Sequence, residues 1–304
     1  METVVVARDP RDRPRLHAAL AQLAEQDPLI DLRVLPSALS VSLYGEVQKE
    51  VIEATLAEEY GIPVSFQEST TVYVERVTGT GEAVELLGEP GNPFLATVGL
   101  RVEPATTFSF ALDVPVESMP MYVYNRTTDF SAAMEGYVRD TLSQGLRGWA
   151  VTGAKVTMTA SGYQPPGSTA ADFRKLTPLV LMRALRDAGT RVCEPVHRFH
   201  LEIPAGATSA ALALLAKLGA VPLSQQAGRF FEVTGTIPAV RVRDLERRLP
   251  GISHGEGVLT YAFDHHRPVH GAQPSRPRTD HNPLDRKEYL LWVSRRVAVS
   301  GPAL

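Results

Sequence analysis

The sequence predicts an α+β fold in which two ferredoxin-like βαββαβ units flank a different α/β unit. The order strand, helix, strand, strand, helix, strand occurs over residues 1–77 and again over 193–268, and it is typical of two helices packed on one antiparallel sheet. Between them, residues 78–192 contain two long helical patterns, each with one apolar stripe. The chain has 304 residues, about twice the length of a typical domain, so the length predicts two or three domains. The order of the predicted elements gives three, followed by a tail over 269–304.

The first unit begins with a β-branched run, Thr3–Ala7, that predicts a strand. A helix over 14–26 follows, with apolar residues at three- and four-residue spacing. The remaining predicted elements are strands over 30–35 and 39–43, a helix over 46–60 that Gly61 ends, and strands over 64–66 and 72–77.

The middle unit opens with a bent connector, 78–93, predicted from its Gly, Glu and Pro content. The elements after it are strands over 96–103 and 108–116, a helix over 130–146 with Asp129 as its N-cap, a strand over 149–159, and a helix over 170–188 that Gly189 ends. Pro178 is expected to kink this last helix or to mark its first stable turn. Residues 161–169 are predicted to form a loop, because two adjacent prolines between glycines fit neither a helix nor an inner strand.

The last unit repeats the first pattern. Its predicted elements are a strand over 196–203, a helix over 209–218 capped by Thr208, strands over 221–224 and 230–236, a helix over 238–249 with Val240, Val242 and Leu245 inward, and a strand over 258–263. The tail is predicted as a Pro-, Arg- and His-rich loop over 268–283 and a basic amphipathic helix over 284–297.

Composition restricts the class of protein. The formal net charge of −3 is unevenly spread: residues 1–125 carry −11, whereas 126–200 and 241–304 each carry +4. This asymmetry favours an anionic partner for the C-terminal half, although such a charge is also ordinary for a folded domain.

The sequence shows no membrane or secretion signal. No apolar run approaches the roughly 20 residues that span a bilayer, and the N-terminus lacks the basic region of a secretory signal. The single cysteine, Cys193, excludes an intrachain disulfide and favours a reducing, cytoplasmic compartment.

Motifs of nucleotide-binding enzymes are absent from the sequence. No G-x-x-x-x-G-K-[ST] occurs, and no G-x-G-x-x-G lies between a predicted strand and helix. Cys193 has no base near it in sequence and is expected to be a buried thiol. We therefore expect no catalytic residue, no metal and no cofactor in this chain. Four histidines near the C-terminus follow no zinc spacing: His265, His266, His270 and His281.

The loop at 161–169 has a composition suited to RNA. Tyr163, Pro165 and Pro166 offer flat apolar faces on which unpaired bases stack, and Ser168 and Thr169 offer hydroxyls for phosphates. On composition alone, a plain surface turn is the alternative.

Several segments resemble known translation factors. Residues 43–51 (LYGEVQKEV) resemble the start of the second helix in the third domain of elongation-factor-G-like translational GTPases. Residues 144–149 (QGLRGW), 168–174 (STAADFR), 188–190 (AGT) and 194–195 (EP) are similar to domains four and five of the ribosomal protection proteins that confer tetracycline resistance. The resemblance covers nearly the whole chain in collinear order.

The resemblance implies a C-terminal portion of such a protein, from a split or a truncated gene. The family has a GTPase domain and a β-barrel before three further domains, which here are domain III over 1–77, domain IV (ribosomal protein S5 domain 2-like) over 78–192 and domain V over 193–268. GTP and magnesium would bind in the N-terminal GTPase domain, in cis or in trans, so this chain alone is not an enzyme. The implied partners are the 70S ribosome and its 16S rRNA, and the protein is expected to be monomeric and cytoplasmic.

The resemblance also implies the site residues. A loop that enters the tetracycline site maps onto Tyr163, Gln164, Pro165, Pro166, Gly167, Ser168 and Thr169. Pro166 is the position that stacks on a 16S rRNA base, whereas Gln164, Pro165 and Gly167 depart from the residues common in the family. A second tip loop maps onto Tyr124, Asn125, Arg126, Thr127 and Thr128, and tail contacts to rRNA map onto Arg286, Lys287, Arg295 and Arg296. From position alone, phosphate contacts are expected at Arg126, Arg147, Arg174, Arg286 and Arg296.

Two alternatives stay open on the sequence. The chain could be the same portion of an elongation factor G type translocase, but the histidine expected near that loop apex is missing at 163–173. It could also be a free-standing interaction protein unrelated to ribosomes, which would not pellet with them.

Overall fold

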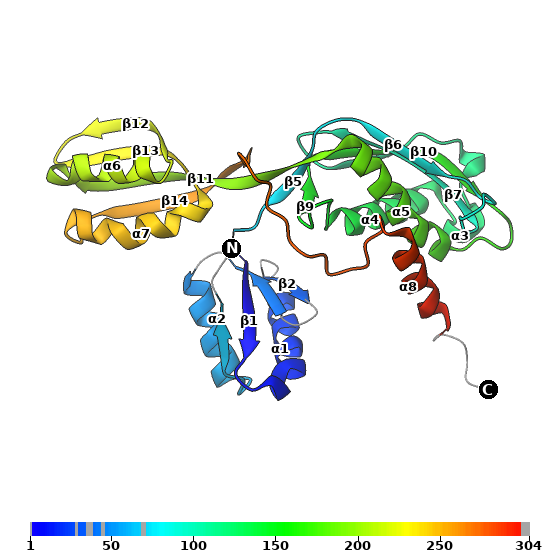
Figure 1. The fold of residues 1–304 in the computed structure, drawn as a ribbon, viewed down its shortest axis with the longest axis horizontal. Coiled ribbons are helices and arrows are strands. Elements are labelled where there is room, and N and C mark those ends of the chain that lie inside the picture. The colour runs from blue at the N-terminus through cyan, green and yellow to red at the C-terminus, as the bar shows by residue number, and fades with distance from the viewer. Residues whose placement is uncertain (1, 28–29, 35–38, 44–45, 68–70, 299–304) are drawn as a thin grey trace. The chain divides into compact units, whose positions relative to one another are not determined.

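The computed structural model describes residues 2–27, 30–34, 39–43, 46–67 and 71–298. They form two compact units, each made of two chain segments (Figure 1). The first unit contains residues 1–72 and 194–267, and the second contains 73–193 and 268–304.

Residues 2–67 form a four-stranded antiparallel sheet with two helices, blue in Figure 1. The elements are β1 (Glu2–Ala7), α1 (Arg13–Gln26), β2 (Asp31–Val34), β3 (Leu39–Ser42), α2 (Glu46–Glu58) and β4 (Val64–Phe66). The strand order β2-β3-β1-β4 is that of a ferredoxin-like sheet, as predicted. Leu16 and Leu20 from α1, Val41 from β3 and Leu56 from α2 are among its buried core residues.

The other segment of the first unit has the same topology. Its elements are β11 (Thr190–Pro204), α6 (Thr208–Lys217), β12 (Val221–Ala227), β13 (Phe230–Pro238), α7 (Ala239–Ser253) and β14 (Val258–Pro268), in the order β12-β13-β11-β14. Phe199, Leu201 and Leu245 lie in its core. Two details of the prediction are wrong: Thr208 is the first residue of α6 instead of its cap, and Val240 is 47% exposed while Val242 faces inward.

The second unit is built on a four-stranded sheet of order β6-β7-β10-β8, in which β10 and β8 are parallel. Its strands are β6 (Gly81–Glu85), β7 (Ala96–Pro104), β8 (Ser109–Leu112) and β10 (Ala154–Tyr163), and its helices include α3 (Met121–Tyr124), α4 (Thr127–Leu142) and α5 (Ala170–Ala188). Helix α5 packs on β6, β7 and α4. Phe130 and Met134 from α4 meet Phe173 and Leu176 from α5 in a fully buried core.

Two predictions about segments at the junction of the predicted first and middle units are wrong. One segment joins a different sheet, and the other is a strand instead of a connector. Residues 72–77 do not complete the first sheet, because β5 (Val74–Val77) pairs with β9 (Ala150–Thr152) and with Thr190–Cys193 of β11. The predicted connector 78–93 contains strand β6, in which Gly81 serves close packing: an added Cβ would lie 2.1 Å from the carbonyl oxygen of Ala184 in α5.

Three shorter corrections concern the middle unit. Helix α4 begins at Thr127, so Asp129 lies in its first turn, where a carboxylate favours the positive helix end, instead of capping it. The predicted strand over 149–159 is interrupted by Gly153, with φ of +64°, and the second part, β10, continues through Tyr163. The loop is therefore shorter than predicted. Helix α5 has the predicted bounds, with Pro178 inside it.

The tail returns to the second unit, and its described part includes helix α8 (Arg286–Ala298). Tyr289 and Val293 of this helix are buried in the same core as α4 and α5, and the Tyr289 hydroxyl donates to the Lys175 carbonyl at 2.9 Å. Of the helices described, none is long and apolar enough to cross a membrane.

Candidate nucleic-acid interface

The double-proline loop is an exposed turn between β10 and α5. Gln164, Pro165, Pro166 and Gly167 are all exposed, and the chain enters the turn from the end of a ten-residue strand. Both prolines present their rings to solvent on a rigid base, which is the arrangement that stacking on an unpaired base requires.

Ser168 closes this turn from inside the unit. Its side chain is buried, with 2% of the residue exposed. The Gln164 amide donates to the Ser168 hydroxyl oxygen at 2.7 Å, the hydroxyl donates to the Leu95 carbonyl at 2.5 Å, and the Ser168 amide donates to the Gln164 carbonyl at 2.9 Å. The hydroxyl therefore has its hydrogen-bond partners within the protein, and the prediction that Ser168 faces a phosphate is not supported by its geometry.

Thr169 and Asp172 form a capping box at the start of α5. The Thr169 amide and hydroxyl donate to one Asp172 oxygen at 2.8 and 2.7 Å, and the Asp172 amide donates back to the Thr169 carbonyl at 3.1 Å. The other Asp172 oxygen accepts from the Leu95 amide at 3.2 Å. The segment before β7 is thus bonded to both Ser168 and Asp172.

The second predicted tip loop adjoins the first through Tyr122. The Tyr122 hydroxyl donates to the Ser168 carbonyl at 2.8 Å, and its ring lies 5.6 Å from the ring of Tyr163. Tyr124 is buried against Phe130 and Phe173, so its ring belongs to the core and burial raises the pKa of its phenol. The four residues after it are exposed: Asn125, Arg126, Thr127 and Thr128.

Sequence reasoning missed Tyr122. It lies in a four-residue helix whose role is visible only once β10 and α3 are brought together, and no motif marks it.

The predicted phosphate contacts of this unit are exposed. Arg126, Arg147 and Arg174 all have exposed side chains, as phosphate contacts require, and Arg126 pairs with Asp129 at 3.1 Å.

The predicted tail residues divide into three cases. Arg286 is bonded within the unit: its guanidinium pairs with the buried Glu85 carboxylate and donates to the Gly91 carbonyl at 2.6 Å. The Glu85 carboxylate raises the pKa of Arg286. Lys287 is exposed. The side chains of Arg295 and Arg296 lie outside the part of the chain that the structure describes.

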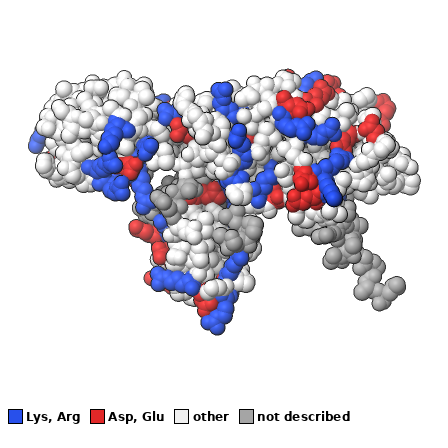
Figure 2. Space-filling view, viewed as in Figure 1, with Lys and Arg blue, Asp and Glu red and all other residues white. Residues whose placement is uncertain are grey.

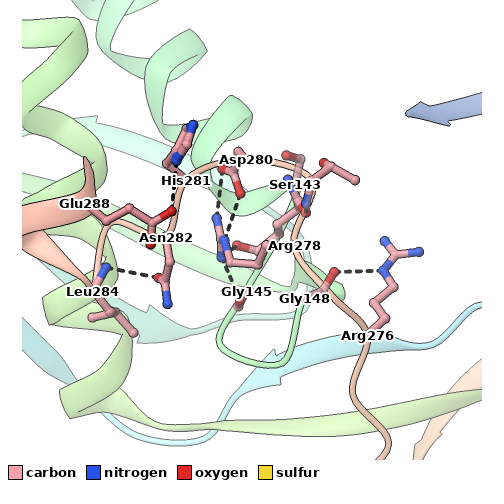
Figure 3. Close-up of polar contacts among 12 residues, drawn as sticks. Ser143, Gly145, Gly148, Arg276, Arg278, Asp280, His281, Asn282, Leu284 and Glu288 are labelled. Carbon is pink, nitrogen blue, oxygen red and sulfur yellow. Dashed lines mark hydrogen bonds and ion pairs between the residues drawn. The ribbon is translucent and has the colours of Figure 1, made fainter. Parts of the chain in front are cut away.

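Two further tail arginines hold the 144–149 segment (Figure 3). The Arg276 Nε donates to the Gly148 carbonyl at 2.8 Å, and its guanidinium lies 4.5 Å from the Trp149 ring. The Arg278 Nη1 donates to the carbonyls of Gln144 and Gly145 at 2.7 and 2.9 Å, while the same guanidinium pairs with Asp280. We call residues 274–279, which bond to this segment at both ends, the tail strap.

The same 144–149 segment is also held by Glu75 of β5. The carboxylate is fully buried and accepts from the amides of Leu146, Arg147 and Trp149 at 2.9, 2.8 and 3.2 Å, and from the Thr190 hydroxyl at 2.6 Å. Glycine is required at 145, because an added Cβ would lie 2.7 Å from that carboxylate. The QGLRGW motif is therefore a structural motif.

Two histidines of the C-terminal region pair with neighbouring carboxylates. His265 pairs with Asp264 at 2.7 Å and His281 with Glu288 at 2.9 Å, and no metal-binding group of three ligands occurs in the described residues. Burial raises the pKa of the Cys193 thiol, as expected for a structural cysteine.

Helix α7 carries a second basic surface that sequence reasoning did not single out. Arg241, Arg243, Arg247 and Arg248 are all exposed, and a group of blue side chains marks this helix in Figure 2. Arg241 and Arg247 share Asp244, at 3.6 and 3.1 Å.

The fold and these motifs correspond to a known class of protein domains. Residues 70–189 match the family model of elongation factor G domain IV, and residues 191–277 match the model of the elongation factor G C-terminus. The chain therefore carries domain IV and the C-terminal domain of the elongation factor G type.

Relatives give the particular branch of this family. The chain is 44% identical over 98% of its length to the oxytetracycline resistance protein of Streptomyces rimosus, and 36% identical over 96% of its length to the tetracycline resistance protein TetP of Clostridium perfringens. It spans 45% of the length of each relative. The chain is homologous, over nearly its whole length, to the C-terminal portion of tetracycline ribosomal protection proteins.

A solved structure of a Thermus thermophilus protein agrees on the fold. It matches with a TM-score of 0.66 and 21% identity, covering 99% of this chain and 43% of that one.

Proposed function

We propose that this chain is the ribosome-binding portion of a tetracycline ribosomal protection protein, and that its double-proline turn displaces the drug from the decoding region of the small subunit. GTP hydrolysis would be supplied by an N-terminal GTPase domain, in cis or in trans. The tetracycline resistance proteins among its relatives support this assignment, because the chain is 44% identical to one of them over 98% of its own length and covers 45% of that relative.

The observation that carries the proposal is the exposed Pro165–Pro166 tip on a rigid base. Four residues project, and the residues on either side are fixed by a buried hydroxyl, a capping box and a strand. A base stacked on an aromatic side chain gains roughly 1–3 kcal/mol, and contacts of a base with the two proline rings need supply only part of this to bias a nucleotide between two positions. A rigid tip loses little entropy when it inserts, so most of this contact energy remains available for moving the base.

Phosphate contacts would supply affinity without sequence preference. Three exposed arginines belong to the same unit as the tip: Arg126, Arg147 and Arg174. Each neutralised phosphate adds to the salt dependence of binding, so we expect ribosome association to weaken steeply as salt rises.

The second candidate function is translocation, as in elongation factor G itself. This function is a candidate because residues 70–189 and 191–277 match models of elongation factor G domains. The loop sequence at 163–169 and the resistance proteins among the relatives favour drug displacement.

The first experiment measures the tetracycline minimum inhibitory concentration of a sensitive host. The host expresses the chain alone, or the chain joined to the N-terminal portion of the Streptomyces rimosus relative, with and without Pro165→Ala plus Pro166→Ala. We expect clear protection from the joined protein, little from the chain alone, and a loss of protection in the double variant.

The matched control is Pro222→Ala, an exposed proline of strand β12. It should protect as well as the unmodified protein. Joined halves that give no protection would contradict the proposed function, and a double variant that protects normally would contradict the role of the loop.

A further inference from the structure

We propose that Ser168 and Tyr122 are the positioning residues that set the height and rigidity of the double-proline tip, and that neither needs to touch RNA. The proposal rests on the proposed function and assigns two residues to it. Ser168 acts through its buried hydroxyl, and Tyr122 through its phenol.

The Ser168 hydroxyl joins its own turn to the distant segment at Leu95 through one atom. It accepts the Gln164 amide at the start of the turn, and it donates to the Leu95 carbonyl, 73 residues away in sequence. The Ser168 amide returns a bond to the Gln164 carbonyl at 2.9 Å, so the turn is closed by two bonds between the same two residues. Removing the hydroxyl leaves the Gln164 amide and the Leu95 carbonyl without this partner.

Tyr122 fixes the remaining polar group of Ser168. Its hydroxyl donates to the Ser168 carbonyl at 2.8 Å, and its ring packs on Tyr163, the last residue of β10. Tyr122 belongs to α3, which leads into the exposed residues of the second tip loop. The first tip loop is therefore bonded to the helix that carries the second, and the two loops are expected to move as one body.

The carboxylate of Asp172, beside the turn, also helps to hold the turn in position. Asp172 accepts from the Leu95 amide while Ser168 holds the Leu95 carbonyl, so both polar groups of this peptide segment are fixed. Four exposed residues thus project from a base in which the surrounding backbone groups have partners.

The first measurement is amide hydrogen exchange in the complete 304-residue chain. In Ser168→Ala the Gln164 amide should exchange about tenfold faster than in the wild type, while the Asp172 amide, which donates to the Thr169 carbonyl, is unchanged. Tyr122→Phe keeps the ring and removes one bond, so it should accelerate exchange at Gln164 and Ser168 by a smaller factor. Unchanged exchange at Gln164 in both variants would overturn the proposal.

The second measurement separates positioning from general destabilisation. In the joined protein, Ser168→Ala and Tyr122→Phe should reduce tetracycline protection while leaving ribosome pelleting near wild type. Tyr122→Phe, which removes one bond from a half-exposed ring, should also leave the thermal midpoint near wild type. Ser168→Thr, which retains the hydroxyl, should protect better than Ser168→Ala. Normal protection by Tyr122→Phe and Ser168→Ala would overturn the positioning role.

The two arms distinguish this proposal from the proposed function. A wild-type joined protein without any protection would contradict drug displacement, and hydrogen exchange would still decide whether Ser168 holds the turn. If Ser168→Ala does not fold, Tyr122→Phe decides alone, since its ring is half exposed and stays in place.

Discussion

At the residue scale, several polar side chains of the second unit hold backbone groups of distant segments. Glu75 gathers three amides and one hydroxyl from segments more than 70 residues away, and Ser168 does the same on a smaller scale at the tip. A buried carboxylate is stable only when such donors surround it. These residues are therefore expected to be structural, although their motifs lie close to the candidate interface.

Glu75→Gln tests this structural role. The amide nitrogen would replace one acceptor oxygen and face N–H donors, which leaves buried amides without a partner. We expect the second unit to lose about 3 kcal/mol of unfolding free energy, measured by urea denaturation monitored by tryptophan fluorescence, since both tryptophans of the chain, Trp149 and Trp292, belong to this unit. Glu82→Gln, an exposed carboxylate of β6, is the matched control and should change it by less than about 0.5 kcal/mol. Equal effects of the two substitutions would contradict the assignment.

At the element scale, the tail shows that a basic composition does not by itself identify a contact with RNA. Arg276, Arg278 and Arg286 contribute to the positive charge of the tail, yet their guanidinium groups bond to Gly148, Gly145 and Glu85 within the same unit. The tail and α8 are thus part of the second unit, with Tyr289 and Val293 in its core.

Arg278→Ala is expected to loosen the 144–149 segment. The side chain is 12% exposed and holds two backbone carbonyls, so its loss should cost about 1–3 kcal/mol of the unfolding free energy of this unit. Lys287→Ala, on the exposed face of α8, should have no measurable effect on stability. Thermal unfolding of the two variants under identical conditions would test this. An Arg278→Ala variant that unfolds at the same temperature as the unmodified protein would contradict the claim that Arg278 holds the 144–149 segment.

Elements with a strong local pattern could be predicted from the sequence, and pairings between distant segments could not. Helix α5 has the predicted bounds because its cap, apolar stripe and terminal glycine lie within one segment. The alternation in β5 does not specify which sheet it joins, and Gly81 serves close packing on α5 where a bend was expected.

The candidate site follows the same division. The exposure of Gln164–Gly167 follows from two adjacent prolines, which the sequence displays. The inward position of Ser168, the role of Tyr122 and the pairing of Arg286 with Glu85 depend on partners 46 to 201 residues away, which no local pattern indicates.

At the scale of the whole molecule, net charge rises along the chain but does not single out the domain that carries the tip. Residues 1–77 carry −6, 78–192 carry −1, 193–268 carry +1 and the tail over 269–304 carries +3. Contacts with RNA phosphates therefore depend on where individual arginines lie, and not on the net charge of a domain. Part of the tail charge is bonded internally, so the exposed arginines of the second unit and of α7 remain as the candidates for phosphate contacts.

Removal of tetracycline from the ribosome is the role we propose for the Pro165–Pro166 tip. It can be followed directly as the release of radiolabelled tetracycline from 70S ribosomes, measured by filter binding after addition of the joined protein and GTP. We expect rapid release by the wild type, and retention of the drug by the Pro165→Ala, Pro166→Ala variant even though that variant still pellets with ribosomes. Release by both proteins at the same rate, or by neither, would contradict this role.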